Sequence, residues 1–168
     1  VREQKQLHNK IKKLSKELSD YLDFDLIEKI CKTTSSLEKI KSVNPKKPKI
    51  SIAIALDNSF NFYYHDNIEA LRREGAKIKF FSPISDKKIP NCDLIYLGGG
   101  FPEILASSLE KNSSMKKSIK NNAENGTPIY AECGGLMYLT NSITYGHKKS
   151  KMVGLFDVDT VMTKKMTL

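Results

Sequence analysis

One cysteine in a glycine-rich stretch could act as a nucleophile. Cys133 follows the apolar segment 128–131 and precedes Gly134 and Gly135, a pattern that predicts a short strand, a sharp turn and a helix. On such a turn, backbone amides and the positive end of the helix dipole favour the reactive thiolate over the thiol. The alternative is a small core residue in an ordinary strand-to-helix turn. Cys133 is therefore either a nucleophile or a structural cysteine.

A second stretch could bind an anion through its backbone. Gly98, Gly99 and Gly100 follow a predicted strand and precede a predicted helix, so their amides could hold a phosphate or an oxyanion. The G-x-G-x-x-G spacing of dinucleotide sites is absent, and the chain has no Gly-Lys pair of the kind a P-loop needs. Two interpretations remain, an oxyanion hole shared with the Gly134 amide and a tight turn.

A cysteine that transfers acyl groups also needs a base, usually histidine. The chain has three histidines, His8, His65 and His147. His8 falls on the polar side of a predicted helix, His65 on an aromatic loop and His147 in a lysine-rich loop, positions typical of surface or capping histidines. We therefore expect the base that serves Cys133 to be missing from this chain.

Composition narrows the class of protein. The 168 residues are 39% hydrophobic, enough for one domain with a sizeable core and an appendage. Three widely spaced cysteines predict neither a disulfide framework nor a metal site, and fit a reducing compartment. The sequence has no apolar run long enough for a bilayer and no leader, so we expect a soluble, cytoplasmic protein without a membrane partner.

The net charge of +9 raises the possibility of nucleic-acid binding. Lysines are scattered over every predicted surface helix, arginines number only three, and no aromatic residues interleave with a basic stripe. This distribution is typical of a solvated surface, and we expect no nucleic-acid partner.

The first 49 residues predict helices and a linker. Apolar residues from Leu7 to Tyr21 recur at steps of four and three, which indicates an amphipathic helix that packs against a neighbouring domain. Asp25 is the expected N-cap of a helix over 26–32, and a short helical turn is expected over 36–41. Two prolines among charges predict a linker over 44–49. The expected domains are therefore 1–43, 44–49 and 50–168.

Beyond the linker, predicted strands and helices alternate. Strands are expected at 50–56, 77–82, 93–97, before Cys133 and at 152–158. Helices are expected from about His65 to Glu74, from Pro102, and from about Ser114 to Asn125. This alternation predicts an α/β fold with a doubly wound, mostly parallel sheet. Ligands bind such sheets at the carboxyl ends of the strands, where the three glycines and Cys133 fall.

Several stretches resemble one family when they are taken together. They are Asp57 with Phe60-Asn61-Phe62-Tyr63-Tyr64, Phe81-Ser82-Pro83, Tyr96-Leu97-Gly98-Gly99-Gly100-Phe101-Pro102-Glu103, and Tyr130-Ala131-Glu132-Cys133-Gly134-Gly135-Leu136-Met137-Tyr138-Leu139. From about Lys49 to its end the chain resembles the C-terminal class I glutamine amidotransferase domain of the cobyrinic acid a,c-diamide synthase family, whose fold is flavodoxin-like. Residues before the linker look like the tail of the ATP-binding domain that precedes it.

The resemblance implies roles for individual residues. Cys133 would attack the side-chain amide of glutamine, and the amides of Gly134 and of Gly99 or Gly100 would hold the tetrahedral oxyanion. Residues implied to contact the substrate are Phe101, Glu132 and Tyr64. The ammonia would pass to a site that needs ATP and Mg2+ and lies outside this chain, where the a- and c-acetate carboxylates of a cobyrinic-acid-type tetrapyrrole are amidated. A related enzyme acts on nickel-sirohydrochlorin in coenzyme F430 biosynthesis, and the motifs do not separate the two substrates.

The implied partners are glutamine, a corrinoid or sirohydrochlorin-type tetrapyrrole, the chain's own upstream ATP-binding domain and a second copy in a homodimer. The chain starts at Val1 and stops directly after a predicted strand, as an excerpt would. The family's catalytic histidine and its acidic partner are expected beyond Leu168, and its P-loop before Val1. We therefore expect the isolated chain to hydrolyse glutamine poorly or not at all.

Two further hypotheses stay open. The chain could be a non-catalytic module that docks on a synthetase through its first helix and its aromatic loop. It could also be a cysteine hydrolase of the same fold with another substrate, which would need His65 close to Cys133.

Overall fold

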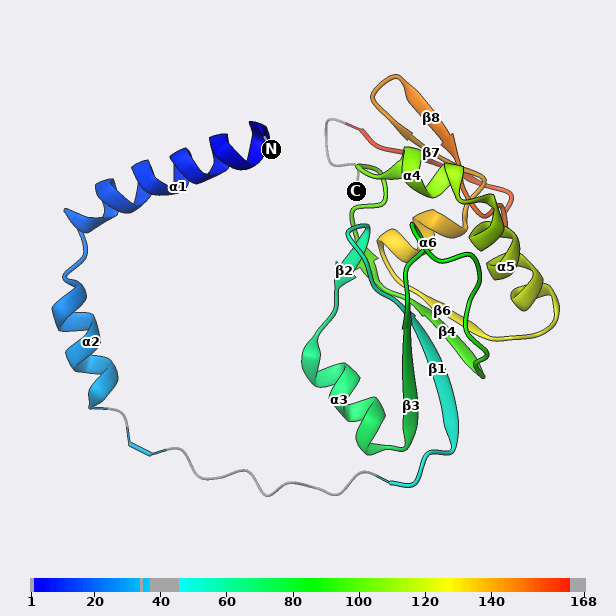
Figure 1. Ribbon diagram of the computed structural model, residues 1–168, viewed down its shortest axis with the longest axis horizontal. Helices are drawn as coiled ribbons and strands as arrows, with labels where there is room; N and C mark the ends of the chain where they lie inside the picture. The colour runs from blue at the N-terminus through cyan, green and yellow to red at the C-terminus, as the bar shows by residue number, and fades with distance from the viewer. Residues whose placement is uncertain (1, 34, 37–45, 164–168) are drawn as a thin grey trace. The chain divides into compact units, whose positions relative to one another are not determined.

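Two units make up the chain in this computed structural model, residues 1–42 and residues 43–168. The structure describes residues 2–33, 35–36 and 46–163, and each unit is considered by itself (Figure 1). Most of the helical turn expected over 36–41 and the first two residues of the expected linker lie outside the described residues. None of the helices in the described part of the chain combines the length and the hydropathy needed to cross a bilayer.

The described part of the first unit contains two helices, α1 (Arg2–Ser19) and α2 (Phe24–Lys32). The expectation for the second helix was wrong by two residues, because the N-cap is Asp23 and not Asp25. The Asp23 carboxylate accepts a hydrogen bond of 2.8 Å from the Leu26 amide, which leaves Asp25 in the first turn, where its charge favours the helix dipole. Apolar side chains of both helices are exposed.

A four-stranded parallel sheet forms the centre of the second unit. Its strands are β1 (Ile50–Ala55), β3 (Ala76–Phe81), β4 (Leu94–Leu97) and β6 (Ile129–Ala131), in the order β3-β1-β4-β6 (Figure 1). The predicted doubly wound, mostly parallel α/β fold is confirmed. The chain runs from β1 outward to β3 and then crosses back to β4, so the direction of winding reverses between β1 and β4. Ligand sites of open α/β sheets lie at such a reversal.

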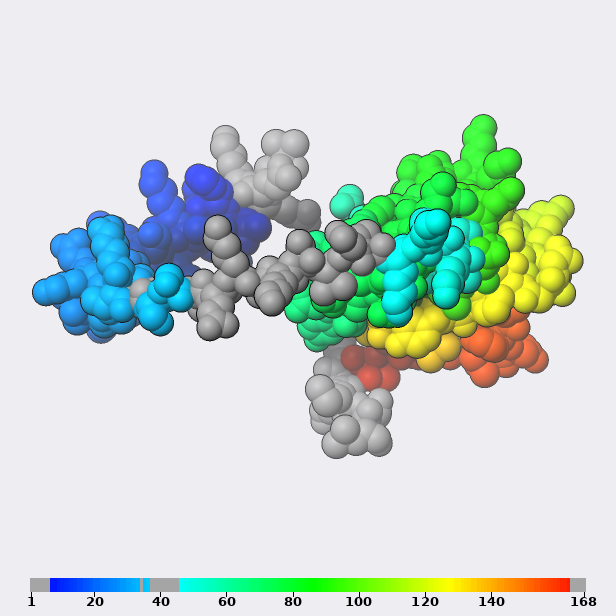
Figure 2. Space-filling model, turned by 90° about the horizontal axis from the view of Figure 1, so that it is seen from below, coloured from blue at the N-terminus to red at the C-terminus, as the bar shows by residue number. Residues whose placement is uncertain are grey.

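Helices cover the two faces of this sheet unequally. On one face lies α3 (His65–Arg73), followed by Gly75 in the left-handed conformation that the sequence predicts for a helix end. On the other lie α4 (Ala106–Lys111), α5 (Ser113–Glu124) and α6 (Gly134–Leu139). The space-filling view shows this unit as one continuous body (Figure 2).

The side chains of β1 differ in size between the two faces of the sheet. Ile52 and Ile54 point to the α3 face, where they join a core cluster with Ile68 of α3. Ala53 and Ala55 point to the other face and belong to the larger cluster that α4, α5 and α6 cover. The small side chains let those helices approach the sheet closely, and the branched ones fill the gap under the single helix α3.

The segment after the three glycines differs from the sequence-based expectation. Gly99–Gly100 form a short strand, β5, which pairs in antiparallel fashion with β2 (Phe60–Phe62) from the aromatic loop. Pro102 does not open a helix, because residues 102–105 form a turn and α4 begins only at Ala106. Pro102 is buried and its ring packs close to Gly134, so this turn contacts the residues after Cys133.

The strand expected at 152–158 is wrong. These residues form a loop, flanked by β8 (Lys148–Lys151) and β9 (Asp159–Val161), which with β7 (Ser142–Tyr145) build a separate three-stranded sheet in the order β8-β7-β9. The apolar residues that suggested a strand are buried for another reason, because Met152 and Val153 belong to the larger core cluster.

The loop 152–158 has its own hydrogen-bonding partner, the end of α6. The Val153 amide donates to the carbonyl of Tyr138, and the amides of Leu155 and Phe156 both donate to the carbonyl of Leu139, at 2.9 to 3.1 Å. The last carbonyls of a helix have no partner inside the helix. The loop supplies these partners and so fixes the carboxyl end of α6.

Candidate active site

Cys133 lies on a strained turn between β6 and α6. We name residues 131–135 the nucleophile turn. Cys133 has φ 50° and ψ −116°, the single positive φ among the described residues other than glycine. Such a conformation costs about 1–3 kcal/mol and persists where surrounding packing enforces it, often at functional sites. The thiol is exposed, so the structural alternative of a buried core cysteine does not describe this residue.

The amide that follows Cys133 has no hydrogen-bond partner among the described residues, although Gly134 itself is buried. Gly134 is the first residue of α6, and its N–H donates no hydrogen bond within the described part of the chain, whereas the Gly135 amide donates to the Glu132 carbonyl at 2.9 Å. A free donor beside a nucleophile is what an oxyanion hole requires.

The three glycines lie directly against this turn. We name residues 98–100 the glycine turn. A Cβ placed on Gly134 would lie 3.1 Å from the carbonyl oxygen and 3.2 Å from the nitrogen of Gly100. A Cβ on Gly135 would lie 2.1 Å from the Leu97 carbonyl oxygen, an impossible contact. The two turns approach this closely because their facing residues lack side chains.

The glycine turn is also enclosed from the other side. A Cβ on Gly100 would lie 2.1 Å from the carbonyl oxygen of Ser59, and the Phe101 amide donates to that same oxygen at 2.9 Å. The loop from Asp57 to Tyr64 therefore packs on the glycine turn. This loop, which the sequence marks by its unusual run of aromatic residues and by the family resemblance, packs against the candidate site.

Asp57 holds that loop in place. One carboxylate oxygen of Asp57 accepts from the amide and the hydroxyl of Ser59, at 2.8 and 2.6 Å, and from the Phe60 amide at 3.3 Å. The other accepts from the Ser82 hydroxyl at 2.8 Å and the Ile84 amide at 2.9 Å. A single carboxylate thus joins the ends of β1 and β3.

Tyrosines surround the carboxylate that precedes the thiol. The Tyr96 hydroxyl donates to the Glu132 carboxylate, and the Tyr96 ring packs edge-on against Tyr63 and Tyr130, with centroids 5.2 and 5.1 Å away. Burial, and after it the bond to Glu132, raises the pKa of Tyr96 far above its ordinary value. Tyr96 is therefore a neutral donor at physiological pH.

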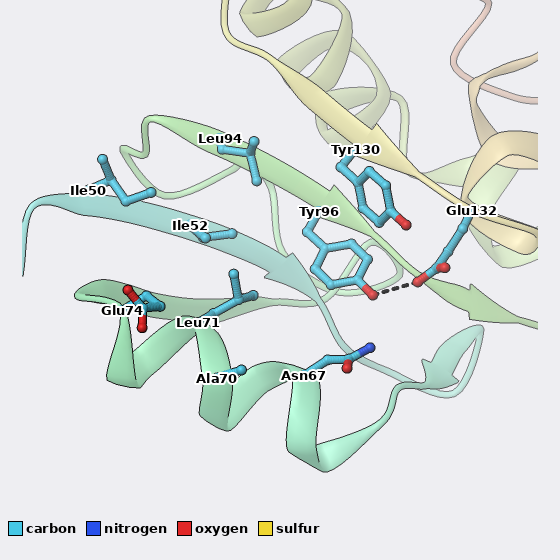
Figure 3. A pocket seen from close by; sticks show the side chains of 10 residues that line it. All are labelled: Ile50, Ile52, Asn67, Ala70, Leu71, Glu74, Leu94, Tyr96, Tyr130 and Glu132. Carbon is cyan, nitrogen blue, oxygen red and sulfur yellow. Dashed lines mark hydrogen bonds between the residues drawn. The ribbon is translucent and has the colours of Figure 1, made fainter. Parts of the chain in front are cut away.

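Glu132 lines a groove on the α3 face of the sheet. Figure 3 shows its carboxylate at one end of the groove beside Tyr96 and Tyr130, with Glu74 at the other end. The groove has a volume of about 600 Å³ and mostly apolar walls, formed by Ile50, Ile52, Asn67, Ala70, Leu71, Glu74, Leu94, Tyr96, Tyr130 and Glu132.

The sequence-predicted residues are thus only partly brought together. Gly134, directly after Cys133, packs against Gly100, and Gly99 lies next to Gly100 in β5. Phe101 is 58% exposed directly after the glycine turn. Tyr64 is 66% exposed at the start of α3, where its ring contacts Phe62, 5.6 Å between centroids.

The histidines do not complete the site. His65 is exposed at the first position of α3, and His147 is exposed in the turn between β7 and β8. Within the described residues no hydrogen bond or ion pair joins Cys133 to a histidine. The same residues contain no group of three or more His, Cys, Asp or Glu side chains that could hold a metal ion.

Sequence reasoning missed the contributions of Tyr63 and Tyr96. Tyr96 stands out only as a hydroxyl-bearing residue in an otherwise aliphatic strand that leads into the three glycines. Tyr63 was one aromatic among four in its loop, and nothing in the spacing separates it from Tyr64.

Comparisons with known proteins identify the family of this chain. Residues 51–168 match the model of the CobB/CobQ-like glutamine amidotransferase domain. A cobyrinate a,c-diamide synthase of Methanococcus vannielii is 49% identical over 150 residues, which is 89% of this chain and 31% of that protein. One of Listeria innocua is 42% identical over 167 residues, 98% of this chain and 37% of that protein. The chain spans about a third of the length of these relatives.

A solved structure supports the fold. The crystal structure of a putative peptidase E protein from Listeria monocytogenes superposes with a TM-score of 0.52 at 16% identity, over 68% of this chain and 67% of that one. At this identity the likeness concerns the fold and not the chemistry.

Proposed function

This chain belongs to the CobB/CobQ-like glutamine amidotransferase domain family, and we propose that it carries the glutaminase nucleophile of an amide-forming synthetase. The observation that carries the proposal is the exposed Cys133 thiol at φ 50°, beside an unbonded Gly134 amide and against the glycine turn.

The proposed reaction begins with attack by the Cys133 sulfur on the side-chain amide carbon of glutamine. The carbonyl oxygen becomes an oxyanion, which accepts hydrogen bonds from the Gly134 amide and from Gly99 or Gly100. One such donor typically lowers the barrier by about 3 kcal/mol. The carbon–nitrogen bond then breaks, ammonia leaves with an added proton, and a glutamyl thioester remains. Water hydrolyses this thioester to glutamate and restores the thiol.

The proton that leaves with ammonia needs a donor. None of the described histidines is bonded to Cys133, and we propose that the acid–base group comes from outside the described residues. In line with this, we expect the isolated chain to react with thiol reagents but to turn over glutamine slowly.

We further propose that the ammonia serves amidation of the a- and c-acetates of a cobyrinic-acid-type corrinoid, because the relatives described above are cobyrinate a,c-diamide synthases. The residues present do not fit a site for ATP and Mg2+, since the chain has no Gly-Lys pair and its described part has no cluster of metal ligands. The proposed glutaminase reaction uses neither ATP nor Mg2+ in any step. Residues 1–43 are proposed to belong to the ATP-binding domain, with 44–49 as linker, and the cytoplasm is the proposed compartment.

The test is covalent labelling with 6-diazo-5-oxo-L-norleucine, a glutamine-like diazoketone. We expect the reagent to modify Cys133 at least tenfold faster than Cys31 or Cys92, as measured by peptide mapping. Equally slow labelling of all three cysteines would contradict the proposal and favour a non-catalytic interaction module. A Cys133 thiol whose reaction with iodoacetamide is lost in His65→Ala would instead favour a cysteine hydrolase of the same fold with another substrate.

A further inference from the structure

The ladder between β1 and β4 stops early on one side of the glycine turn. β1 pairs with β4 only as far as Ile54 and Tyr96, although its pairing with β3 continues through Ala55 and Phe81. On the other side of β4, pairing with β6 also continues, through Leu97. The Leu97 and Gly98 peptide groups, which lie between this ladder and the β2–β5 pair, therefore lack a strand partner on the β1 side.

A side chain takes the place of the missing strand contact. The hydroxyl of Tyr63 donates to the carbonyl of Ala55 at the end of β1 and accepts from the amide of Gly98, 2.9 Å away. One oxygen atom thus joins the ends of the two strands at the point where they separate. Burial raises the pKa of Tyr63 to about 12, so the hydroxyl keeps its proton and both hydrogen bonds at neutral pH.

The Tyr63 ring also leaves no alternative position for the turn. A Cβ on Gly98 would lie 2.3 Å from Cε1 and 2.5 Å from Cζ of this ring, so the ring packs directly against the backbone of Gly98 and only glycine fits there. The ring is itself packed edge-on against Tyr96 at 5.2 Å. The ring therefore also has contacts with the sheet, through Tyr96 of β4 and the Ala55 carbonyl of β1.

We propose that Tyr63 is a positioning residue, whose hydroxyl fixes the Gly98 amide and thereby orients the Gly99 and Gly100 peptides toward the oxygen that forms during attack by Cys133. This inference rests on the proposed glutaminase function. Tyr63 acts through the glycine turn and is not itself a catalytic residue. The Cys133 thiol, which lies on the other turn, does not depend on it.

Two reagents distinguish the role of the glycine turn from the reactivity of the Cys133 thiol itself. The ketone of 6-diazo-5-oxo-L-norleucine places an oxygen where the glutamine amide oxygen would lie, so its reaction uses the oxyanion amides. Iodoacetamide alkylates a thiolate by direct displacement of iodide and forms no oxyanion. The Tyr63→Phe variant keeps the ring and removes only the hydroxyl. Tyr145→Phe is the matched control, because Tyr145 is an exposed tyrosine on β7.

We expect Tyr63→Phe to slow modification of Cys133 by the diazoketone about tenfold, part of the 100- to 1,000-fold loss typical when a whole oxyanion donor is removed. The iodoacetamide rate should stay within twofold, and Tyr145→Phe should change neither rate. Hydrogen exchange of the Gly98 amide should be faster in Tyr63→Phe, because its acceptor is gone.

Other results would overturn the inference. An equal loss with both reagents would mean that the hydroxyl supports the whole site and not the glycine turn. Unchanged rates with unchanged exchange at Gly98 would mean that the hydroxyl has no positioning role. If the unsubstituted chain shows no preference of the diazoketone for Cys133, the proposed function itself fails, and this inference fails with it.

Discussion

The nucleophile turn and the glycine turn follow neighbouring parallel strands, yet they are held in different ways. The nucleophile turn depends mainly on residues next to Cys133 in the sequence, since Gly134 and Gly135 allow it to press against the glycine turn and the end of β4, and one side-chain bond from Tyr96 to Glu132 adds to this. The glycine turn is fixed by Tyr63 and by the loop that Asp57 holds, about 40 residues earlier in the chain. A reactive side chain can thus be positioned locally, whereas bare amides need support from elsewhere in the fold.

The largest expected effect is on the nucleophile turn. Cys133→Ala should abolish diazoketone labelling at this position and reduce any glutamine hydrolysis by at least about 1,000-fold, because no other group supplies the nucleophile. Cys31→Ala, which removes another exposed thiol, is the control and should keep the wild-type rate. Labelling is measured by intact mass. Residual labelling of Cys133→Ala at the wild-type rate would remove Cys133 from the mechanism.

The strain at Cys133 gives a second prediction for the same turn. Cys133→Gly should have a free energy of unfolding about 1 kcal/mol higher than that of Cys133→Ala. Glycine adopts φ 50° without the cost of about 1–3 kcal/mol that alanine retains. The difference is the strain less the greater unfolded-state entropy of glycine. Equilibrium unfolding in urea measures it. If Cys133→Gly is the less stable of the two by the usual entropy difference between glycine and alanine, the turn stores no strain.

Gly100→Ala tests how tightly the glycine turn is enclosed. Its Cβ would meet the Ser59 carbonyl oxygen at 2.1 Å, a backbone atom that cannot rotate away, so we expect a loss of about 1–3 kcal/mol in unfolding free energy and slower diazoketone labelling. Gly126→Ala is the matched control, since its φ is also positive but nothing lies within 4 Å of the new Cβ. The control should lose only about 1 kcal/mol and keep its labelling rate.

Asp57→Ala should affect the glycine turn at a distance. Removing a carboxylate that accepts five hydrogen bonds should cost about 1.5–3 kcal/mol and slow labelling by the diazoketone more than alkylation by iodoacetamide. Asp93→Ala is its control, because Asp93 accepts from Ser51 at the start of β1, at the opposite end of the sheet. Asp93→Ala should lose stability without a change in the ratio of the two rates. If the ratio of the diazoketone rate to the iodoacetamide rate is the same in both variants, Asp57 has no role in the site.

The smallest effect is expected for Tyr96→Phe. The change frees the Glu132 carboxylate one residue before Cys133 but keeps the ring contacts with Tyr63 and Tyr130. We expect a loss of about 1 kcal/mol in stability and a similar, modest slowing of both thiol reagents, since this bond supports the nucleophile turn. If only the rate of modification by the diazoketone falls, Tyr96 instead supports the glycine turn.

The same contrast explains what the sequence could predict. The strand, turn and glycines around Cys133 are contiguous, so their pattern predicted the nucleophile turn, and alternating strands and helices predicted the sheet. Tyr63 could not be assigned, because its role depends on where β1 and β4 separate, which is a property of the folded sheet. Residues 152–158 were misread as a strand because burial against α6 and burial within a sheet leave the same apolar signature.

The loop that caps α6 has a mechanical consequence. With six residues this helix is only about 9 Å long, and it is anchored at both ends, by glycine contacts behind the thiol and by the loop 152–158 at its far end. That loop continues directly into β9 of the small sheet. Through this one short helix, the position of Cys133 is therefore tied to the loop 152–158 and, beyond it, to the small sheet.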